Sequence, residues 1–160
     1  MKTVRGDLIR LAQAGHFDVI VHGCNCFCTM GSGFAKQVKA AYPEAASIDA
    51  TTTKGDAAKL GHFTWVKVNG DAGDFIIVNA YIQYKYGRGQ RHVSYEAVSQ
   101  VFERINQWFP GSRIAYPAIG AGLAGGDWRV ISEIIDEKLS GQDHTFVKYD
   151  GQWGFHPHNF

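Results

Sequence analysis

The chain has 160 residues, of which 45% are hydrophobic and 19% are charged, and its formal net charge is +1 at pH 7. This length fits one compact domain with a sizeable core, and the composition excludes an intrinsically disordered chain. The near-neutral charge argues against a protein that binds nucleic acid through a broad basic face. We therefore expect a single domain over residues 1–160 that is a monomer.

Targeting signals are absent from the sequence pattern. There is no run of 18 apolar residues, and positions 2, 5 and 7 carry charged side chains. A transmembrane span and a secretory signal are both disfavoured by these features. We expect no membrane partner and a location in the cytoplasm, either of a cell or of an infected host.

The first half of the chain alternates strand-like with helix-like segments. Apolar and β-branched residues predict strands at 3–6 and 17–22, with a brief helical turn at 7–11 between them. A helix is predicted at 34–41. A second helix is predicted from residue 43 to about residue 50, because proline suits the first helical turn.

The second half begins with two strands, at 62–68 and 75–83, whose connecting turn residues 69–74 predict an antiparallel hairpin. Apolar periodicity then predicts the remaining elements in chain order: an amphipathic helix at 94–108, a strand at 113–116, a helix at 127–139 and a strand at 145–149. The aromatic, histidine-containing residues 151–160 match no pattern of secondary structure.

Strands that alternate with helices imply a layered α/β domain, and the hairpin makes its sheet mixed. We predict a three-layer α/β/α sandwich around a mixed central sheet. Ligands of such sheets lie beyond the carboxyl ends of the strands, where the glycine-rich loops 31–33 and 120–126 both begin. The two loops together favour a clamp for one extended phosphorylated ligand. Alternatively, their glycines only supply positive φ angles.

The three cysteines alternate at positions 24, 26 and 28. With His22 they offer four potential ligands, so a small Cys/His metal-binding protein is one alternative. Four ligands within seven residues would wrap a metal awkwardly, and metal sites usually draw ligands from separate segments. We expect free thiols beside a tight loop, no metal and no cofactor.

Three motifs in a fixed order resemble those of a macro domain, the ADP-ribose-binding module. The resemblance begins at Arg5-Gly6-Asp7-Leu8, extends to the last helix, and is carried by His22-Gly23-Cys24-Asn25-Cys26, Met30-Gly31-Ser32-Gly33-Phe34-Ala35 and Pro117-Ala118-Ile119-Gly120-Ala121-Gly122-Leu123. It implies a macro domain fold over 1–160. Within the family, the chain looks closest to stand-alone yeast-type ADP-ribose-1″-phosphate phosphatases and their bacterial and phage relatives, which implies the cytoplasm of a bacterium or of a phage-infected host.

The resemblance also implies how ADP-ribose is bound. Asp7 matches an acid that contacts adenine, although it could equally cap a helix, and Asn25 matches an asparagine that binds the distal ribose. The first loop surrounds the distal phosphate and ribose, and the second cups the diphosphate with backbone amides. The implied ligand-binding residues are Asp7, Leu8, Asn25, Met30, Gly31, Ser32, Gly33, Phe34, Pro117, Ile119, Gly120, Ala121, Gly122 and Leu123.

Three residues are candidates for catalysis. His22 stands where a phosphatase-like branch has a histidine, and it could act on a terminal phosphate or only orient the loop. Asp127 could act as an acid or cap the last helix. Lys85 matches the lysine of a branch that removes ADP-ribose from carboxylates, but Ala124 occupies the place of that branch's loop aspartate. Lys85 could instead belong to a solvated basic lip.

We therefore expect a protein that binds ADP-ribose and processes a derivative of it. The reaction is either removal of phosphate from ADP-ribose-1″-phosphate or removal of mono-ADP-ribose from a protein. The alternative is a reader that binds ADP-ribose without turnover. Nucleic acid is expected as a partner only if it is itself ADP-ribosylated.

Overall fold

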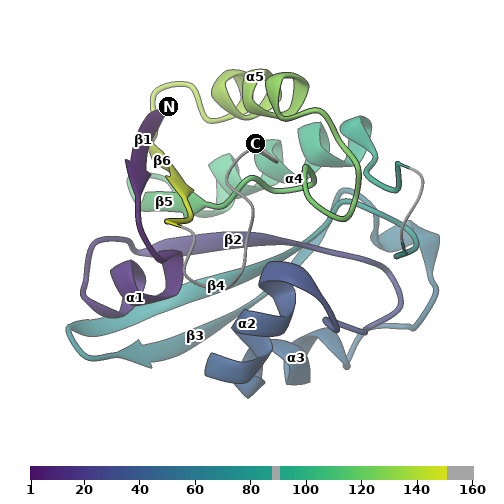
Figure 1. Cartoon of the computed structure of the whole chain (residues 1–160), viewed down its shortest axis with the longest axis horizontal. Coiled ribbons are helices and arrows are strands. Elements are labelled where there is room, and N and C mark those ends of the chain that lie inside the picture. The colour runs from purple at the N-terminus through teal and green to yellow at the C-terminus, as the bar shows by residue number, and fades with distance from the viewer. Residues whose placement is uncertain (88–90, 151–160) are drawn as a thin grey trace.

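The computed structural model describes residues 1–87 and 91–150, with a six-stranded sheet between two layers of helices (Figure 1). The strands are β1 (Lys2–Arg5), β2 (Val19–Cys24), β3 (Phe63–Gly70), β4 (Gly73–Tyr81), β5 (Arg113–Tyr116) and β6 (Asp143–Lys148). The helices are α1 (Leu8–Gln13), α2 (Gly33–Ala41), α3 (Pro43–Asp49), α4 (Tyr95–Trp108), α5 (Trp128–Lys138) and the short 3-10 helix η1 (Ala57–Lys59). Residues 151–160 lie outside the described part.

The strand order is β1-β6-β5-β2-β4-β3. All neighbouring pairs are parallel except β3 and β4, which form the predicted antiparallel hairpin. The hairpin is tighter than the sequence predicted, because Asn69 pairs with Asp74 and Gly70 with Gly73. Five parallel strands therefore direct their carboxyl ends to the same edge of the sheet, and the predicted mixed sheet is confirmed.

Two separate apolar layers cover the faces of the sheet. On β2, Val19 and Val21 point toward the core beneath α4 and α5, whereas Ile20 and Cys24 point toward the core beneath α1, α2 and α3. Figure 1 shows the same arrangement, with α4 and α5 on one side of the strands. This alternation is the period-two pattern of a strand that is buried on both faces. The predicted three-layer α/β/α sandwich is confirmed.

Helix α4 illustrates how the local sequence sets an element. The side chain of Ser94 accepts a hydrogen bond from the backbone N–H of Ala97 and caps the helix. Apolar residues at helical spacing then pack on the sheet, namely Ala97, Val98, Val101, Phe102 and Ile105. Across the described residues, none of the helices has the length and apolar character that crossing a bilayer requires.

Candidate functional site

A cavity of about 680 Å³ lies over the carboxyl ends of the five parallel strands. Four strand spacings correspond to about 19 Å, so the cavity is an elongated cleft. Its lining follows the strand order: Gly6 and Leu8 after β1, Val147 and Tyr149 at the end of β6, residues 117–120 and 122–124 after β5, residues 25 and 30–37 after β2, and Gln83, Tyr86 and Gly87 after β4. This is the usual ligand position in α/β sheets.

The cleft brings together most of the residues that the sequence singled out. All of the predicted ligand-binding residues line it except Asp7 and Ala121, and so does His22. Neither Lys85 nor Asp127 is among the lining residues. Sequence reasoning missed the contributions of Lys36, Gln83, Tyr86, Val147 and Tyr149. The position of Gln83 and Val147 near the ends of predicted strands was the available signal.

The first loop, residues 25–32, is shaped by side-chain contacts. The Asn25 amide donates to Thr29 Oγ1 at 2.7 Å and accepts from the backbone N–H of Phe27 at 2.7 Å. An amide has a second hydrogen and a second lone pair, so Asn25 retains capacity for a ligand hydroxyl. Cys28 and Met30 have φ angles of 58° and 43°, which are uncommon for residues with a side chain. The loop is thus held in a conformation that costs energy.

Helix α2 begins directly at the cleft. Among the described residues, the Ser32 side chain forms no capping hydrogen bond, and the first turn contains no acidic residue. The first backbone N–H groups of a helix have no partner within it, and they favour an anion. A Cβ placed on Gly33 would lie 3.9 Å from Leu123 Cδ1, so the second loop comes close to this helix start.

The second loop, residues 117–126, uses its glycines for different purposes. The N–H of Gly126 donates to the Gly120 carbonyl at 2.8 Å, and a Cβ on Gly126 would lie only 2.6 Å from that oxygen. A Cβ on Gly122, by contrast, would meet no atom within 4 Å. In the described part of the chain, the N–H groups of residues 122–124 form no hydrogen bond. The loop is therefore closely packed behind and open toward the cleft.

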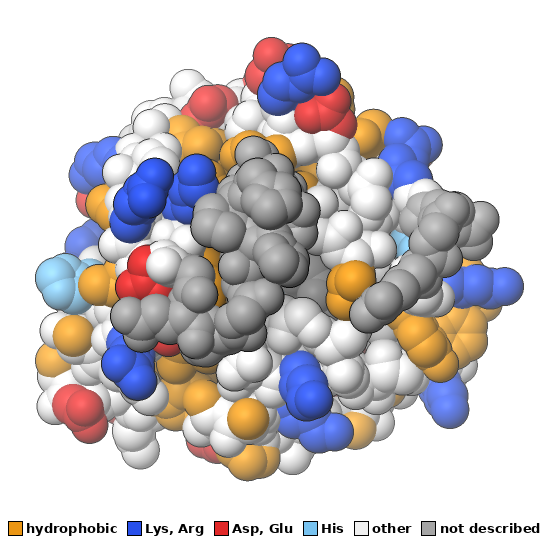
Figure 2. All heavy atoms as spheres, in the orientation of Figure 1, with side chains coloured by type: hydrophobic (Ala, Val, Ile, Leu, Met, Phe, Trp, Pro, Cys, Tyr) orange, Lys and Arg blue, Asp and Glu red, His pale blue; other side chains and the backbone are white. Residues whose placement is uncertain are grey.

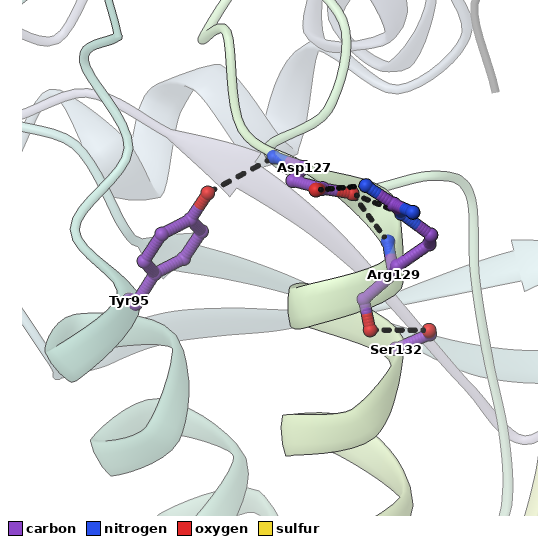
Figure 3. A network of polar contacts seen from close by, with 4 residues as sticks. All are labelled: Tyr95, Asp127, Arg129 and Ser132. Atoms are coloured by element: carbon purple, nitrogen blue, oxygen red, sulfur yellow. Dashed lines mark hydrogen bonds and ion pairs between the residues drawn. The ribbon is translucent and has the colours of Figure 1, made fainter.

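The segment before α4 supports the second loop from outside. The N–H groups of His92 and Val93 both donate to the Ala124 carbonyl, at 2.8 and 3.2 Å. Figure 3 shows the Tyr95 hydroxyl, at the start of α4, directed toward the backbone of Asp127, which donates to it at 3.0 Å. These contacts hold the loop between two helix starts.

Asp127 acts as the N-cap of α5. Its Oδ1 accepts from the backbone N–H of Arg129 at 2.9 Å, and its Oδ2 pairs with the Arg129 guanidinium at 3.1 Å (Figure 3). The hydrogen bonds from Arg129 lower the pKa of Asp127, so this carboxyl is ionised at neutral pH. Its contacts favour the capping interpretation over that of a general acid.

His22 is 1% exposed, and its Nε2 lies 2.6 Å from Asn79 Oδ1. The Asn79 amide nitrogen donates to the Ala45 carbonyl and to Thr64 Oγ1, so Oδ1 is the acceptor and His22 Nε2 carries the proton. Burial lowers the pKa of His22 to about 4, which leaves the ring neutral at physiological pH. A neutral, buried ring in a fixed hydrogen bond favours the orienting interpretation.

The two remaining candidate residues, Asp7 and Lys85, make few side-chain contacts or serve as a helix cap. Asp7 accepts from the backbone N–H of Arg10 at 3.1 Å and caps α1. Lys85 is exposed, and its carbonyl accepts from the Gln83 side chain at 2.8 Å. On the face shown in Figure 2, Lys and Arg side chains stand as separate groups rather than as one basic patch.

All three cysteines are free thiols: Cys24 and Cys26 are buried and Cys28 is half-buried. Burial raises the pKa of Cys24 and of Cys26, which makes both thiols poor metal ligands and poor nucleophiles. Within residues 1–87 and 91–150, no group of three or more His, Cys, Asp or Glu side chains is placed to hold a metal ion. The described residues therefore offer the metal-binding alternative no support.

Solved structures of the same architecture identify the fold. The macrodomain of Mycobacterium tuberculosis DarG superposes with a TM-score of 0.71 at 21% identity, over 91% of this chain and 95% of that chain. Thermosipho africanus DarTG, solved in complex with ADP-ribose, superposes with a TM-score of 0.69 at 15% identity, over 92% of this chain and 42% of that chain. No protein-family model matches the sequence. The fold is that of a macrodomain.

A phage protein is related over nearly the whole length. The chain is 31% identical over 155 residues to an uncharacterized 17.5 kDa protein from the tk-vs intergenic region of Enterobacteria phage T4, covering 94% of this chain and 97% of the phage protein. The chain belongs to the same family as this phage protein. The sequence-based identification as a macro domain with phage relatives is thereby confirmed.

Proposed function

We propose that the protein binds ADP-ribose in the cleft over its five parallel strands. The observation that carries this proposal is the position of two sets of backbone donors on one cavity. The start of α2 supplies one set, and residues 122–124 supply the other, which has no partner within the described residues. Such donors suit the charged oxygens of a diphosphate. The related fold of Thermosipho africanus DarTG, which was solved with ADP-ribose, supports the same ligand.

The residues at the two ends of the cleft indicate which way round ADP-ribose would bind. Leu8 and Val147 provide apolar surface at one end, where adenine would lie. Asp7 caps α1, and the N–H of Leu8 at the first position of that helix has no hydrogen-bond partner among the described residues. Asn25 lies toward the other end of the cleft, after β2, where its spare amide groups suit the distal ribose. The diphosphate would lie between these ends.

Isothermal titration calorimetry tests this proposal directly. We expect ADP-ribose to bind with a stoichiometry near one, and we expect AMP, which lacks the second phosphate and the distal ribose, to bind more weakly. A wild-type protein that releases or absorbs no heat with ADP-ribose over a range of temperatures would refute the proposal.

Turnover of an ADP-ribose derivative is the second candidate function. The cleft continues past Asn25 to Gln83, Tyr86 and Gly87, which leaves room for a group attached to the distal ribose. That group would be the phosphate of ADP-ribose-1″-phosphate or the side chain of a mono-ADP-ribosylated protein. The non-catalytic reader is favoured instead by the buried neutral ring of His22 and by the capping contacts of Asp127.

A turnover panel separates the enzyme from the reader. Release of phosphate or ADP-ribose would be measured with ADP-ribose-1″-phosphate, glutamate-linked and serine-linked mono-ADP-ribose, and O-acetyl-ADP-ribose. An enzyme should act on at least one substrate, and its rate should fall in His22→Ala or Lys85→Ala. Binding of ADP-ribose without turnover of any substrate would identify a reader.

A further inference from the structure

The end of the cleft beyond Asn25 carries an exposed aromatic side chain. Tyr86 follows β4, lines the cleft and is 57% exposed. Its ring lies 6.3 Å from the ring of Phe27 in the first loop, in an edge-to-face arrangement. Within residues 1–87 and 91–150, the Tyr86 hydroxyl forms no hydrogen bond. A ligand in this part of the cleft can therefore reach the Tyr86 side chain.

Two further rings support the position of Tyr86. Phe27 packs edge-to-face on Tyr84, with the ring centroids 5.0 Å apart, and the Tyr84 hydroxyl donates to the Gly55 carbonyl at 2.9 Å. A Cβ placed on Gly55, whose φ is 79°, would lie 3.2 Å from the Phe27 ring, so this glycine lets the ring pack closely. Aromatic pairs in this geometry stabilise each other. Tyr86 thus belongs to a cluster that is formed before any ligand binds, which lowers the entropic cost of binding.

The order of the strands places Tyr86 next to the proposed site of the distal ribose. The strands β5, β2 and β4 are neighbours in the sheet, and the second loop, Asn25 and Tyr86 follow them in that order. The N–H of Cys26 donates to the Tyr84 carbonyl at 3.0 Å, so the segments after β2 and β4 lie side by side. Adjacent strands are about 4.8 Å apart, roughly the width of one ring of a ligand. A group attached to C1″ of a ribose held by Asn25 would therefore lie beside Tyr86.

The charged side chains that line the cleft are unevenly distributed. In the described part of the chain they are Lys36, in the first turn of α2, and Asp49, at the end of α3. The start of α2 is the proposed diphosphate site. Asp49 Oδ1 instead accepts from the hydroxyl of Tyr81, the last residue of β4, at 2.7 Å, so the carboxyl group lies toward the end with Tyr86. Lys59 lies over the Tyr81 ring but does not line the cleft. When ionised, Asp49 attracts a cation and repels a phosphate.

We infer that the cleft favours ligands in which C1″ of the distal ribose carries a planar cation that stacks on Tyr86, an inference that rests on the proposed binding of ADP-ribose. The face of an aromatic ring attracts a cation, and a planar cation can lie flat against it. Two chemical groups fit this description: the pyridinium ring of NAD⁺ and the guanidinium of ADP-ribosylated arginine. The phosphate of ADP-ribose-1″-phosphate is neither planar nor positive. Tyr86 is therefore a specificity-determining residue for the group beyond the distal ribose.

Calorimetry with NAD⁺ and NADH tests the contact with Tyr86. The two ligands differ only in the nicotinamide ring, which is a planar cation in NAD⁺ and an uncharged ring in NADH. The wild type should bind NAD⁺ roughly fivefold more tightly than NADH, the effect of one cation–π contact. Tyr86→Ala should reduce this preference to less than about twofold, and Tyr86→Phe, which keeps the ring, should retain it. Equal binding of NAD⁺ and NADH by the wild type, or a preference that survives in Tyr86→Ala, would overturn the inference.

Trp108→Ala is the matched control for loss of an exposed ring. Trp108 is 61% exposed at the last residue of α4 and does not line the cleft, so this variant should bind every ligand as the wild type does. If Trp108→Ala loses the preference for NAD⁺ as Tyr86→Ala does, the inference is wrong.

ADP-ribosyl-arginine distinguishes the two sources of a planar cation. It or NAD⁺ should bind more tightly than ADP-ribose-1″-phosphate, and the compound that depends more on Tyr86 is the source. Tighter binding of ADP-ribose-1″-phosphate than of both would overturn the inference. In that case ADP-ribose itself still binds and the proposed function stands. If the wild type does not bind ADP-ribose either, the proposed function fails and the role of Tyr86 fails with it.

Discussion

The first loop, residues 25–32, and the second loop, residues 117–126, face the same cleft but are held in different ways. The first is fixed by the Asn25 side chain and includes two residues with positive φ that are not glycine, Cys28 and Met30. The second is fixed by its backbone, with Gly126 pressed against the Gly120 carbonyl. A loop held by side chains should respond to their removal, whereas a loop held by close packing should respond to any addition. The following predictions test this difference.

The largest expected effect is on stability, in the second loop. The Cβ of Gly126→Ala would lie 2.6 Å from the Gly120 oxygen and within 2.8 Å of Val93 and Ile131 side chains, so the backbone has to move. We expect a loss of about 3 kcal/mol in the free energy of unfolding, measured by urea denaturation. Gly122→Ala is the matched control and should be neutral, since its Cβ meets open space. Equal losses in the two variants would contradict the proposed packing.

The next effect is on binding at the open side of the same loop. Gly122→Glu would place a carboxylate in the space proposed for the diphosphate. We expect ADP-ribose to bind about 100-fold more weakly by calorimetry, which corresponds to about 2.7 kcal/mol, with little change in Tm. Gly122→Ala should bind ADP-ribose as the wild type does. An unaffected Gly122→Glu variant would place the diphosphate elsewhere.

Acid should destabilise the protein through His22, which lies beneath the first loop and contacts the Phe34 ring edge-on. Because its pKa is about 4 in the folded state and about 6.5 when unfolded, the unfolded chain binds more protons between these values. The stabilising effect of the neutral His22 ring is complete above pH 6.5, falls progressively as the pH is lowered from 6.5, and is fully lost below pH 4. The expected loss is about 2 kcal/mol between pH 7 and pH 5, measured by denaturation.

His22→Gln should flatten this pH dependence. The slope that remains reports the other groups, among them His144, whose pKa is also lowered by burial. A variant with the full wild-type slope would show that His22 is not the responsible group.

A smaller effect is expected from the side chain that holds the first loop. Asn25→Ala removes the bonds to Thr29 and to the Phe27 N–H, so we expect a loss of about 1 kcal/mol in stability. We also expect ADP-ribose to bind roughly tenfold more weakly, because the distal ribose loses its partner. Thr29→Val, which removes one of the two bonds and keeps the amide, should retain most of the affinity. If both variants bind ADP-ribose as tightly as the wild type, Asn25 does not contact the ligand.

The smallest effect is expected at Asp127. Asp127→Ala removes the N-cap of α5 and the ion pair with Arg129, so Tm should fall slightly while ADP-ribose affinity stays unchanged. Differential scanning calorimetry and titration would be run on the same preparation. A clear loss of affinity at constant Tm would bring Asp127 back into the binding site.

Most helices and strands could be predicted from the sequence, because the patterns that indicate them are local. The alternation in Val19–Cys24 and the helical spacing in Tyr95–Trp108 depend only on neighbouring residues. The tighter hairpin and the short η1 helix were missed. Pairing of Gly70 with Gly73 extends the strands into residues that favour turns, and η1 is set by a cap from Asp56 to the Ala58 N–H.

The site was predicted where a motif marked it and missed where only the fold brings residues together. Val147 lines the cleft because β6 lies between β1 and β5. The periodicity of neighbouring residues does not predict the order of strands in a sheet. The partner of His22 is Asn79, 57 residues away.

The position of β6 also has a consequence for how the protein is made. The first strand, β1, lies at the sheet edge and pairs with β6, the last of the described strands. Leu8 and Val147 can therefore line the proposed adenine end of the cleft together only after β6 has left the ribosome. Contacts between such distant segments form late, since closing a long loop is entropically costly. If the protein binds ADP-ribose as proposed, nascent chains that lack β6 should be unable to retain it.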